Sequence, residues 1–111
     1  MTVKELAKSL DARVLTCEDQ LCGEVTGCYI GDLLSWVMSR AECGDAWLTI
    51  MGNINAVAVA ALADVSCVIL TENAVLDTPA REKAEEQNII FLQTEETGYK
   101  TAIKIYKLLE E

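Results

Sequence analysis

Short apolar runs alternate with segments of helical periodicity along the whole chain, and this alternation restricts the fold more than any other feature. The apolar runs predict strands at Arg13–Cys17, Val25–Ile30, Ala46–Met51, Cys67–Thr71 and Ile89–Gln93. Helices are predicted at Val3–Leu10, from Leu33, near Ile54–Asp64, from Pro79 to about Asn88, and from Thr97-Gly98 to Leu109. Because strands that alternate with helices form parallel βαβ units, we expect an α/β fold: a single layered α/β/α domain with a largely parallel sheet.

The size and composition of the chain fit one domain. It has 111 residues, of which 51% are hydrophobic, so a single core can be buried, whereas two domains of usual size would need a longer chain. The sequence contains no repeat of fixed period and no linker. We therefore expect residues 1–111 to form a single domain.

The charge of the chain excludes several partners. A formal net charge of −9 disfavours nucleic acid and anionic membranes, both of which require clustered Lys and Arg. An acidic surface is typical of a soluble protein, and it can also favour a basic protein partner. No apolar run reaches the 18 residues of a membrane span, and no secretory signal is recognised, so we expect a cytoplasmic protein. The odd number of cysteines, five, suits free thiols in a reducing compartment.

One predicted helix is apolar on every side. Residues 56–63 read Ala-Val-Ala-Val-Ala-Ala-Leu-Ala and leave no polar face. Such a helix is normally covered all round, and a small domain has few elements to cover it. A second copy of the chain would do so, which predicts a homodimer. The alternative is a closely packed helix whose small alanines are tolerated near solvent.

The ends of the predicted strands suggest where a ligand binds. In parallel sheets, ligands bind beyond the carboxyl ends of the strands, where helix N-termini offer free N–H groups. Asp32 and Thr78 are predicted helix caps, and Gly52 would let a ligand approach the backbone closely. The segments expected at this edge are Thr16–Asp19, Gly31-Asp32, Gly52–Asn55, Thr71–Asn73 and Thr94–Thr97. The candidate ligand-binding residues are Thr26, Gly27, Asp32, Gly52, Asn53 and Asn55, and the alternative is that they only make turns and cap helices.

The residues that usually carry catalysis are missing. The chain has no histidine, which excludes Ser-His and Cys-His nucleophile pairs. Six carboxylates are expected at the strand ends, where they would hold Mg²⁺, act as acid and base, or simply face solvent: Glu18, Asp19, Asp32, Glu72, Glu95 and Glu96. Gly98-Tyr99-Lys100-Thr101 resembles a phosphate loop but lacks its Gly-Lys pair, so it is read as a helix start. We expect no catalytic residues, no metal and no cofactor.

The cysteines fit no known cofactor pattern. Their positions, Cys17, Cys22, Cys28, Cys43 and Cys67, contain no Cys-x-x-Cys pair and match no zinc or iron–sulfur spacing. Cys28 and Cys67 lie in predicted strands and are expected in the core. Cys17 and Cys22 flank a loop, so they remain a weaker candidate for a redox or metal pair.

Several short motifs, in order, resemble the DRTGG domain and the N-terminal domain of HPr kinase. The matching segments are Val3–Ala7, Val14-Leu15, Gly44–Ile50, Asn53–Leu62 and Cys67–Thr71, within a resemblance that runs from Val3 to about Leu109. Thr26-Gly27 stands where the name motif has its Thr-Gly, but Cys22-Gly23 replaces the Asp-Arg pair. If that pair binds a ligand in other members, the replacement alters this role here.

The resemblance implies a fold like that of the HPr kinase N-terminal domain and a non-catalytic regulatory or ligand-binding module. HPr kinase keeps its catalysis in a separate P-loop domain, so the resemblance implies no kinase activity here. Members of the family occur joined to CBS modules and as small proteins associated with iron-only hydrogenase. The resemblance therefore also implies an alternative, an accessory or scaffold protein of a hydrogenase or another electron-transfer complex.

Overall fold

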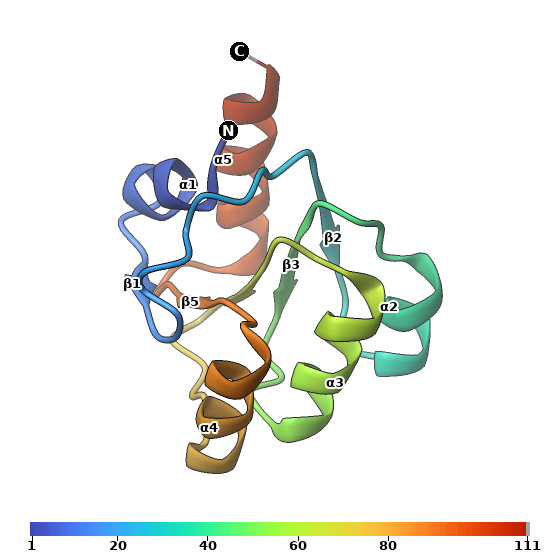
Figure 1. Ribbon diagram of the computed structural model, residues 1–111. Coiled ribbons are helices and arrows are strands. Elements are labelled where there is room, and N and C mark those ends of the chain that lie inside the picture. Colours follow the sequence, from blue (N-terminus) through green and yellow to red (C-terminus); the bar gives the residue numbers. More distant parts are fainter. Residues whose placement is uncertain (111) are drawn as a thin grey trace.

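The computed structural model describes residues 1–110, which form a five-stranded sheet between two layers of helices (Figure 1). The strand order is β1-β5-β4-β3-β2. Strands β2 to β5 are parallel, and β1 runs antiparallel to β5. In chain order the elements are α1 (Val3–Ser9), β1 (Arg13–Val14), β2 (Gly27–Ile30), α2 (Leu34–Arg40), β3 (Asp45–Thr49), α3 (Ile54–Ala63), β4 (Cys67–Leu70), α4 (Thr78–Gln87), β5 (Phe91–Gln93) and α5 (Gly98–Glu110).

The three crossover helices lie on one face of the sheet, and the two terminal helices lie on the other. Successive right-handed crossovers that proceed in one direction place their helices on the same face, as α2, α3 and α4 do here. Successive side chains along each strand point to opposite faces of the sheet, so each face contributes to its own hydrophobic core. Trp47 and Val68 pack with α2–α4, whereas Leu48 and Ile69 pack with α1 and α5. The predicted α/β/α architecture is confirmed.

The apolar helix α3 is covered on most sides by its own chain. It packs on the sheet and lies between α2 and α4. Ala56, Val57, Val59 and Ala60 are buried, and its remaining face is largely alanine. Its exposed large side chains are Ile54 and Leu62, near its two ends. The structure thus supplies an intramolecular reason for the absence of a polar face, and the homodimer stays a prediction.

Two helices begin differently from expectation. Asp32 does not cap α2, whose N-cap residue, Leu33, makes no side-chain cap bond. The Asp32 carboxylate instead accepts hydrogen bonds from Thr49, the last residue of β3, and from Ile50, which follows it. Helix α4 is capped by Asp77, which accepts from the Ala80 N–H at 2.9 Å, so Thr78 is its first residue rather than its cap. Both predicted N-caps therefore differ by one residue from the observed ones, because sequence patterns locate the start of a helix only to within one or two residues.

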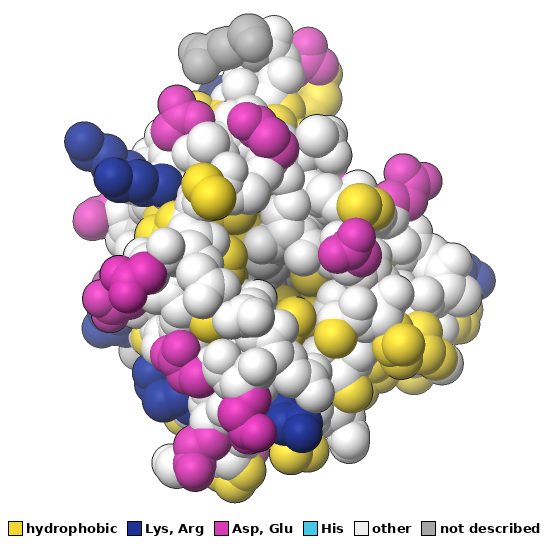
Figure 2. Space-filling model, in the orientation of Figure 1, with side chains coloured by type: hydrophobic (Ala, Val, Ile, Leu, Met, Phe, Trp, Pro, Cys, Tyr) yellow, Lys and Arg dark blue, Asp and Glu magenta, His cyan; other side chains and the backbone are white. Residues whose placement is uncertain are grey.

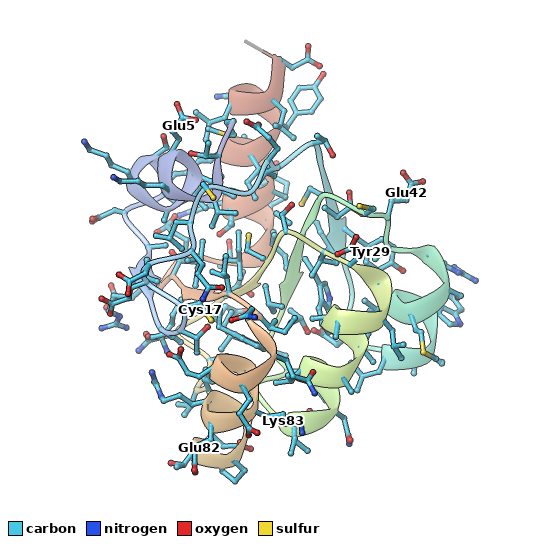
Figure 3. All side chains as sticks on the ribbon, in the orientation of Figure 1. Glu5, Cys17, Tyr29, Glu42, Glu82 and Lys83 are labelled. Carbon is cyan, nitrogen blue, oxygen red and sulfur yellow. The ribbon has the colours of Figure 1, made fainter. Side chains whose placement is uncertain are left out.

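The chain leaves strand β1 earlier than predicted. The Thr16 hydroxyl donates to the Ile89 carbonyl at 2.7 Å and accepts from the Phe91 N–H at 2.8 Å. The Thr16 side chain thus takes the place of the backbone hydrogen bonds that a longer β1 would make with β5. At the next residue, Cys17, a left-handed backbone conformation (φ 55°) turns the chain away. Figure 3 shows Cys17 beside α4, where its Sγ lies 3.7 Å from the Ala84 carbonyl oxygen. Because β1 is antiparallel, Thr16–Asp19 lie at the amino edge of the parallel strands, so their predicted position at the carboxyl edge is wrong.

All five cysteines are free thiols in the described part of the chain, residues 1–110. Cys67 is buried in the core as predicted, whereas Cys28 is exposed on the edge strand β2. Cys17 is buried and Cys22 is exposed, and no bond joins the two. Within residues 1–110, no helix combines the length and the hydropathy needed to cross a membrane.

We expect the thiols to react at very different rates. Burial raises the pKa of Cys67 to about 12. Since the thiolate is the nucleophile, Cys67 should remain unmodified by iodoacetamide at pH 8 while exposed Cys22 is alkylated. Mass spectrometry of timed peptide digests measures both rates. In denaturant the two should react alike, and equal rates in the native protein would contradict the burial of Cys67.

Candidate functional site

The carboxyl ends of β2, β3 and β4 and the start of α5 enclose a pocket of about 350 Å³. We call it the strand-end pocket. Its floor and walls combine apolar side chains, hydroxyls, two carboxylates and one tyrosine. The lining residues are Ile30, Asp32, Leu48, Thr49, Ile50, Thr71, Glu72, Thr97, Gly98 and Tyr99. The pocket therefore lies where the topology of a parallel sheet places a ligand.

Asp32 is held firmly at one side of the pocket. One of its oxygens, Oδ1, accepts a hydrogen bond from the Thr49 hydroxyl at 2.6 Å and another from the Ile50 N–H at 3.0 Å. The Thr49 hydroxyl in turn accepts from the Met51 N–H at 3.2 Å. These bonds tie the end of β2 to the end of β3. They use one carboxylate oxygen of Asp32 and leave the other without a partner among residues 1–110.

Glu72 is placed by a tight turn at the end of β4. Glu72 and Asn73 both adopt left-handed backbone conformations, with φ values of 56° and 58°. Such residues persist where surrounding bonds hold them. Here the Glu72 N–H donates to the Glu96 carbonyl and the Asn73 N–H donates to the Thr94 carbonyl, each at 2.8 Å. The turn is therefore fixed to the end of β5, and Glu72 is fixed with it.

Helix α5 begins at the pocket with unbonded backbone donors. The Thr97 hydroxyl accepts from the Lys100 N–H at 3.2 Å, and the Thr97 carbonyl accepts from the Thr101 N–H at 3.0 Å. The N–H groups of Gly98 and Tyr99 donate to no other group among residues 1–110, as is usual in the first turn of a helix. Tyr99 is 76% exposed and offers a ring face beside them.

The charge of the pocket is negative. Asp32 and Glu72 are its charged lining residues, and neither Lys nor Arg lines it. A bare phosphate would meet these carboxylates and be repelled, despite the donors at the start of α5. The arrangement suits a ligand that donates hydrogen bonds to Asp32 and Glu72, accepts from α5 and stacks on Tyr99.

The structure separates the six predicted site residues into three places. Asp32 lines the strand-end pocket. Gly52, Asn53 and Asn55 lie at the same edge, but at the start of α3 on the opposite face of the sheet. Thr26 and Gly27 lie at the other edge, because they begin β2 rather than end it. The Thr26 N–H donates to the Gly44 carbonyl, and Gly27 pairs with Asp45 at the start of β3, so the prediction that all six share one site is wrong.

The residues at the start of α3 contact their own chain. The Asn53 side chain accepts from the Ala56 N–H at 3.0 Å and caps the helix. The Gly52 carbonyl accepts from the Asp77 N–H at 2.9 Å. A Cβ at Gly52 would lie 2.0 Å from the Val75 carbonyl oxygen. The close approach that was predicted at Gly52 therefore exists, but the backbone of Val75 makes it.

The six predicted carboxylates are also dispersed. Glu18 and Asp19 line a surface pocket with Thr2 and Lys4, which follows from the antiparallel β1. Glu95 and Glu96 lie beside Arg13 and Lys104 in another pocket of about 400 Å³. Only Asp32 and Glu72 line the strand-end pocket. Within residues 1–110, no group of three or more His, Cys, Asp or Glu is arranged to hold a metal ion.

Sequence reasoning missed several lining residues of the pocket, among them Ile30 and Tyr99. The signal for Tyr99 was present, because a helix predicted to start just after a strand-end segment must open at that edge. An aromatic residue in the first turn of such a helix could therefore have been included among the candidate ligand-binding residues. Ile30 gave no such signal, since its exposure depends on β2 being an edge strand.

Comparison with known proteins agrees with this architecture. The structure is similar to a crystal structure of the CBS and DRTGG domains of the regulatory region of Clostridium perfringens pyrophosphatase, complexed with its activator diadenosine tetraphosphate. The TM-score is 0.72 at 14% sequence identity, over 94% of this chain and 45% of that one. No curated protein matches the sequence. The family model of the DRTGG domain matches residues 5–108, nearly the whole chain, and on that ground the chain belongs to the DRTGG domain family.

Proposed function

We propose that this chain is a cytoplasmic regulatory module that binds a small molecule in the strand-end pocket and performs no catalysis on it. The observation that carries the proposal is the convergence of three kinds of group on one pocket: the carboxylates of Asp32 and Glu72, the free N–H groups of Gly98 and Tyr99, and the exposed Tyr99 ring. Asp32 already serves as a fixed acceptor for Thr49 and Ile50, which suits a structural rather than a reacting group.

The ligand we propose is a nucleoside or a nucleotide whose phosphates are neutralised by Mg²⁺. A flat base would stack on Tyr99, and the sugar hydroxyls would donate to Asp32 and Glu72. Free phosphates would be disfavoured by the two carboxylates. The similar regulatory region of the pyrophosphatase is complexed with a dinucleotide, and its likeness at 14% identity supports the fold alone. The choice of ligand therefore depends on the groups in the pocket.

A thermal-shift and calorimetric screen tests the proposal. The probes are adenosine, ATP and diadenosine tetraphosphate, each with and without Mg²⁺. A ligand at 100 times its dissociation constant stabilises the folded state by about 2.7 kcal/mol, which corresponds to roughly 10–15 °C in a domain of this size. We expect a shift with adenosine, and with the nucleotides only when Mg²⁺ is present.

Two variants locate the binding. Tyr99→Ala removes the stacking surface and Glu72→Gln removes one carboxylate, so each should reduce the shift with adenosine. Trp36→Ala is the matched control, because Trp36 is an exposed aromatic residue on α2, outside the strand-end pocket. If no probe shifts the melting temperature, the proposal is wrong. If both pocket variants keep the shift, the ligand binds outside the strand-end pocket.

The acidic surface favours a second candidate, an accessory protein that binds a basic partner in an electron-transfer complex. The net charge is −9, and Figure 2 shows Asp and Glu side chains scattered over the visible face. Binding of this kind weakens as salt screens the charges. Retention of a hydrogenase or ferredoxin-linked partner at low ionic strength, lost at about 0.5 M salt, would favour this candidate over the ligand-binding module.

A further inference from the structure

The two edges of the sheet differ in how well they are protected. Edge strands expose unpaired backbone groups, and proteins usually protect them by shortness or by charge. Strand β1 has two residues, one of them the exposed Arg13. Strand β2, at the other edge, has four residues, Gly27-Cys28-Tyr29-Ile30, and none is charged. The β2 edge therefore lacks the usual protection against pairing with another strand.

An apolar surface continues from this edge onto α5. A groove of about 340 Å³ is lined by Cys28, Ile30, Ala102, Ile105, Tyr106, Leu109 and Glu110. Large side chains beside it are exposed: Ile30 56%, Ile50 50%, Ile103 36% and Tyr106 66%. We call these four residues, with the outer backbone of β2, the β2 edge surface. Its position next to an open strand argues that another chain covers it.

We propose that a second copy of this chain covers the β2 edge surface, with β2 pairing antiparallel to β2 of the other copy. The two sheets would then form one continuous sheet about a two-fold axis normal to it. Residues directly opposite in an antiparallel pair point to the same face. Since Cys28 and Ile30 both face α5, Cys28 must lie opposite either Cys28 or Ile30 of the second copy.

The position of α5 fits this arrangement. The helix packs over β2 and β3, so it lies about one strand spacing, about 5 Å, from the two-fold axis. The two copies of α5 would therefore be about 10 Å apart, near the distance at which helices pack side by side. Ile103 and Tyr106, three residues apart on one side of the helix, would fill the space between the two helices, while Tyr99 in the first turn remains at the strand-end pocket.

The exposed area also favours a second copy. The four side chains together expose on the order of 400 Å², since an aromatic side chain alone covers 150–250 Å². Strand backbone and neighbouring atoms bring this close to the about 800 Å² that each partner of a stable interface buries. The two α5 helices would run antiparallel, so that the first turn of one lies beside the last turn of the other.

Sedimentation velocity without any ligand, from about 1 to 100 µM protein, tests the interface. We expect a species of twice the 12.1 kDa chain mass. Ile30→Lys places a charge in the interface and should raise the dimer dissociation constant at least about tenfold. The matched control is Leu62→Lys, which alters a residue 71% exposed on α3, the other apolar surface. Its dimer should be unchanged.

Tyr106→Glu is the second variant, because Tyr106 is an exposed residue of α5 and its replacement leaves the residues of β2 unchanged. It should also weaken the dimer, while circular dichroism shows both variants folded. A wild-type monomer at 100 µM would overturn the proposal. So would a dimer that Leu62→Lys disrupts and Ile30→Lys and Tyr106→Glu leave intact. No ligand is present, so this result is independent of the strand-end pocket.

Discussion

Trp47→Ala should lower the free energy of unfolding by about 3–5 kcal/mol, because it empties the largest fully buried site of the core. Trp47 is 0% exposed and lies between Tyr29 of β2 and Val68 of β4 in the sheet. Its indole Nε1 donates to the Gly31 carbonyl at 2.9 Å, so the substitution also leaves that acceptor without its partner. A domain of this size is stable by about 5–15 kcal/mol, and the melting temperature should fall by about 12–25 °C.

Urea unfolding followed by circular dichroism measures this change, and Trp36→Ala is its matched control. Trp36 is 51% exposed on α2 and stacks under the Arg40 guanidinium, 3.7 Å from the ring centroid. An exposed cation–π contact contributes about 0.5–1 kcal/mol, so the same substitution there should cost little. If both substitutions lower the free energy of unfolding by the same amount, Trp47 is not buried in the core.

The fold was predictable because its signals are local. The run Cys67–Leu70 is fully buried on both faces of the sheet, as a continuous apolar run in a parallel sheet predicts. The direction of β1 was not predictable from its residues. An apolar run indicates a strand but not its orientation, and here a tertiary contact, the Thr16 bonds to the Ile89–Phe91 segment, ends the strand after two residues.

The candidate site was predicted only in part, because its location depends on which end of a strand each residue occupies. Asp32 follows β2 and reaches the carboxyl edge, whereas Thr26 and Gly27, a few residues earlier, lie at the amino edge. The predicted strand, Val25–Ile30, already has Thr26 and Gly27 at its start and Asp32 after its end, so the sequence was sufficient to place them at opposite edges of the sheet. Tyr99 enters the pocket from α5, far along the chain, and only the folded structure brings it to Asp32.

Gly52→Ala separates two explanations of the same glycine. The added Cβ would lie 2.0 Å from the Val75 carbonyl oxygen and 3.0 Å from the Leu76 Cα, both of them backbone atoms that cannot rotate away. The segment is held in place by the Asp77 N–H bond to the Gly52 carbonyl and by the buried Leu76. We therefore expect a loss of about 3 kcal/mol of stability, and a melting temperature lower by about 10–15 °C, from this overpacking.

Gly23→Ala is the matched control, because a Cβ at Gly23 would meet no atom within 4 Å. That variant should match the wild type within about 0.5 kcal/mol or gain slightly from a less flexible unfolded chain. If Gly52 instead existed to admit a ligand, Gly52→Ala would keep full stability and lose only ligand binding. Calorimetry of both variants, with and without adenosine, distinguishes the two cases. Full stability together with lost binding would show that the ligand binds at the start of α3, near Gly52, Asn53 and Asn55, as the sequence suggested.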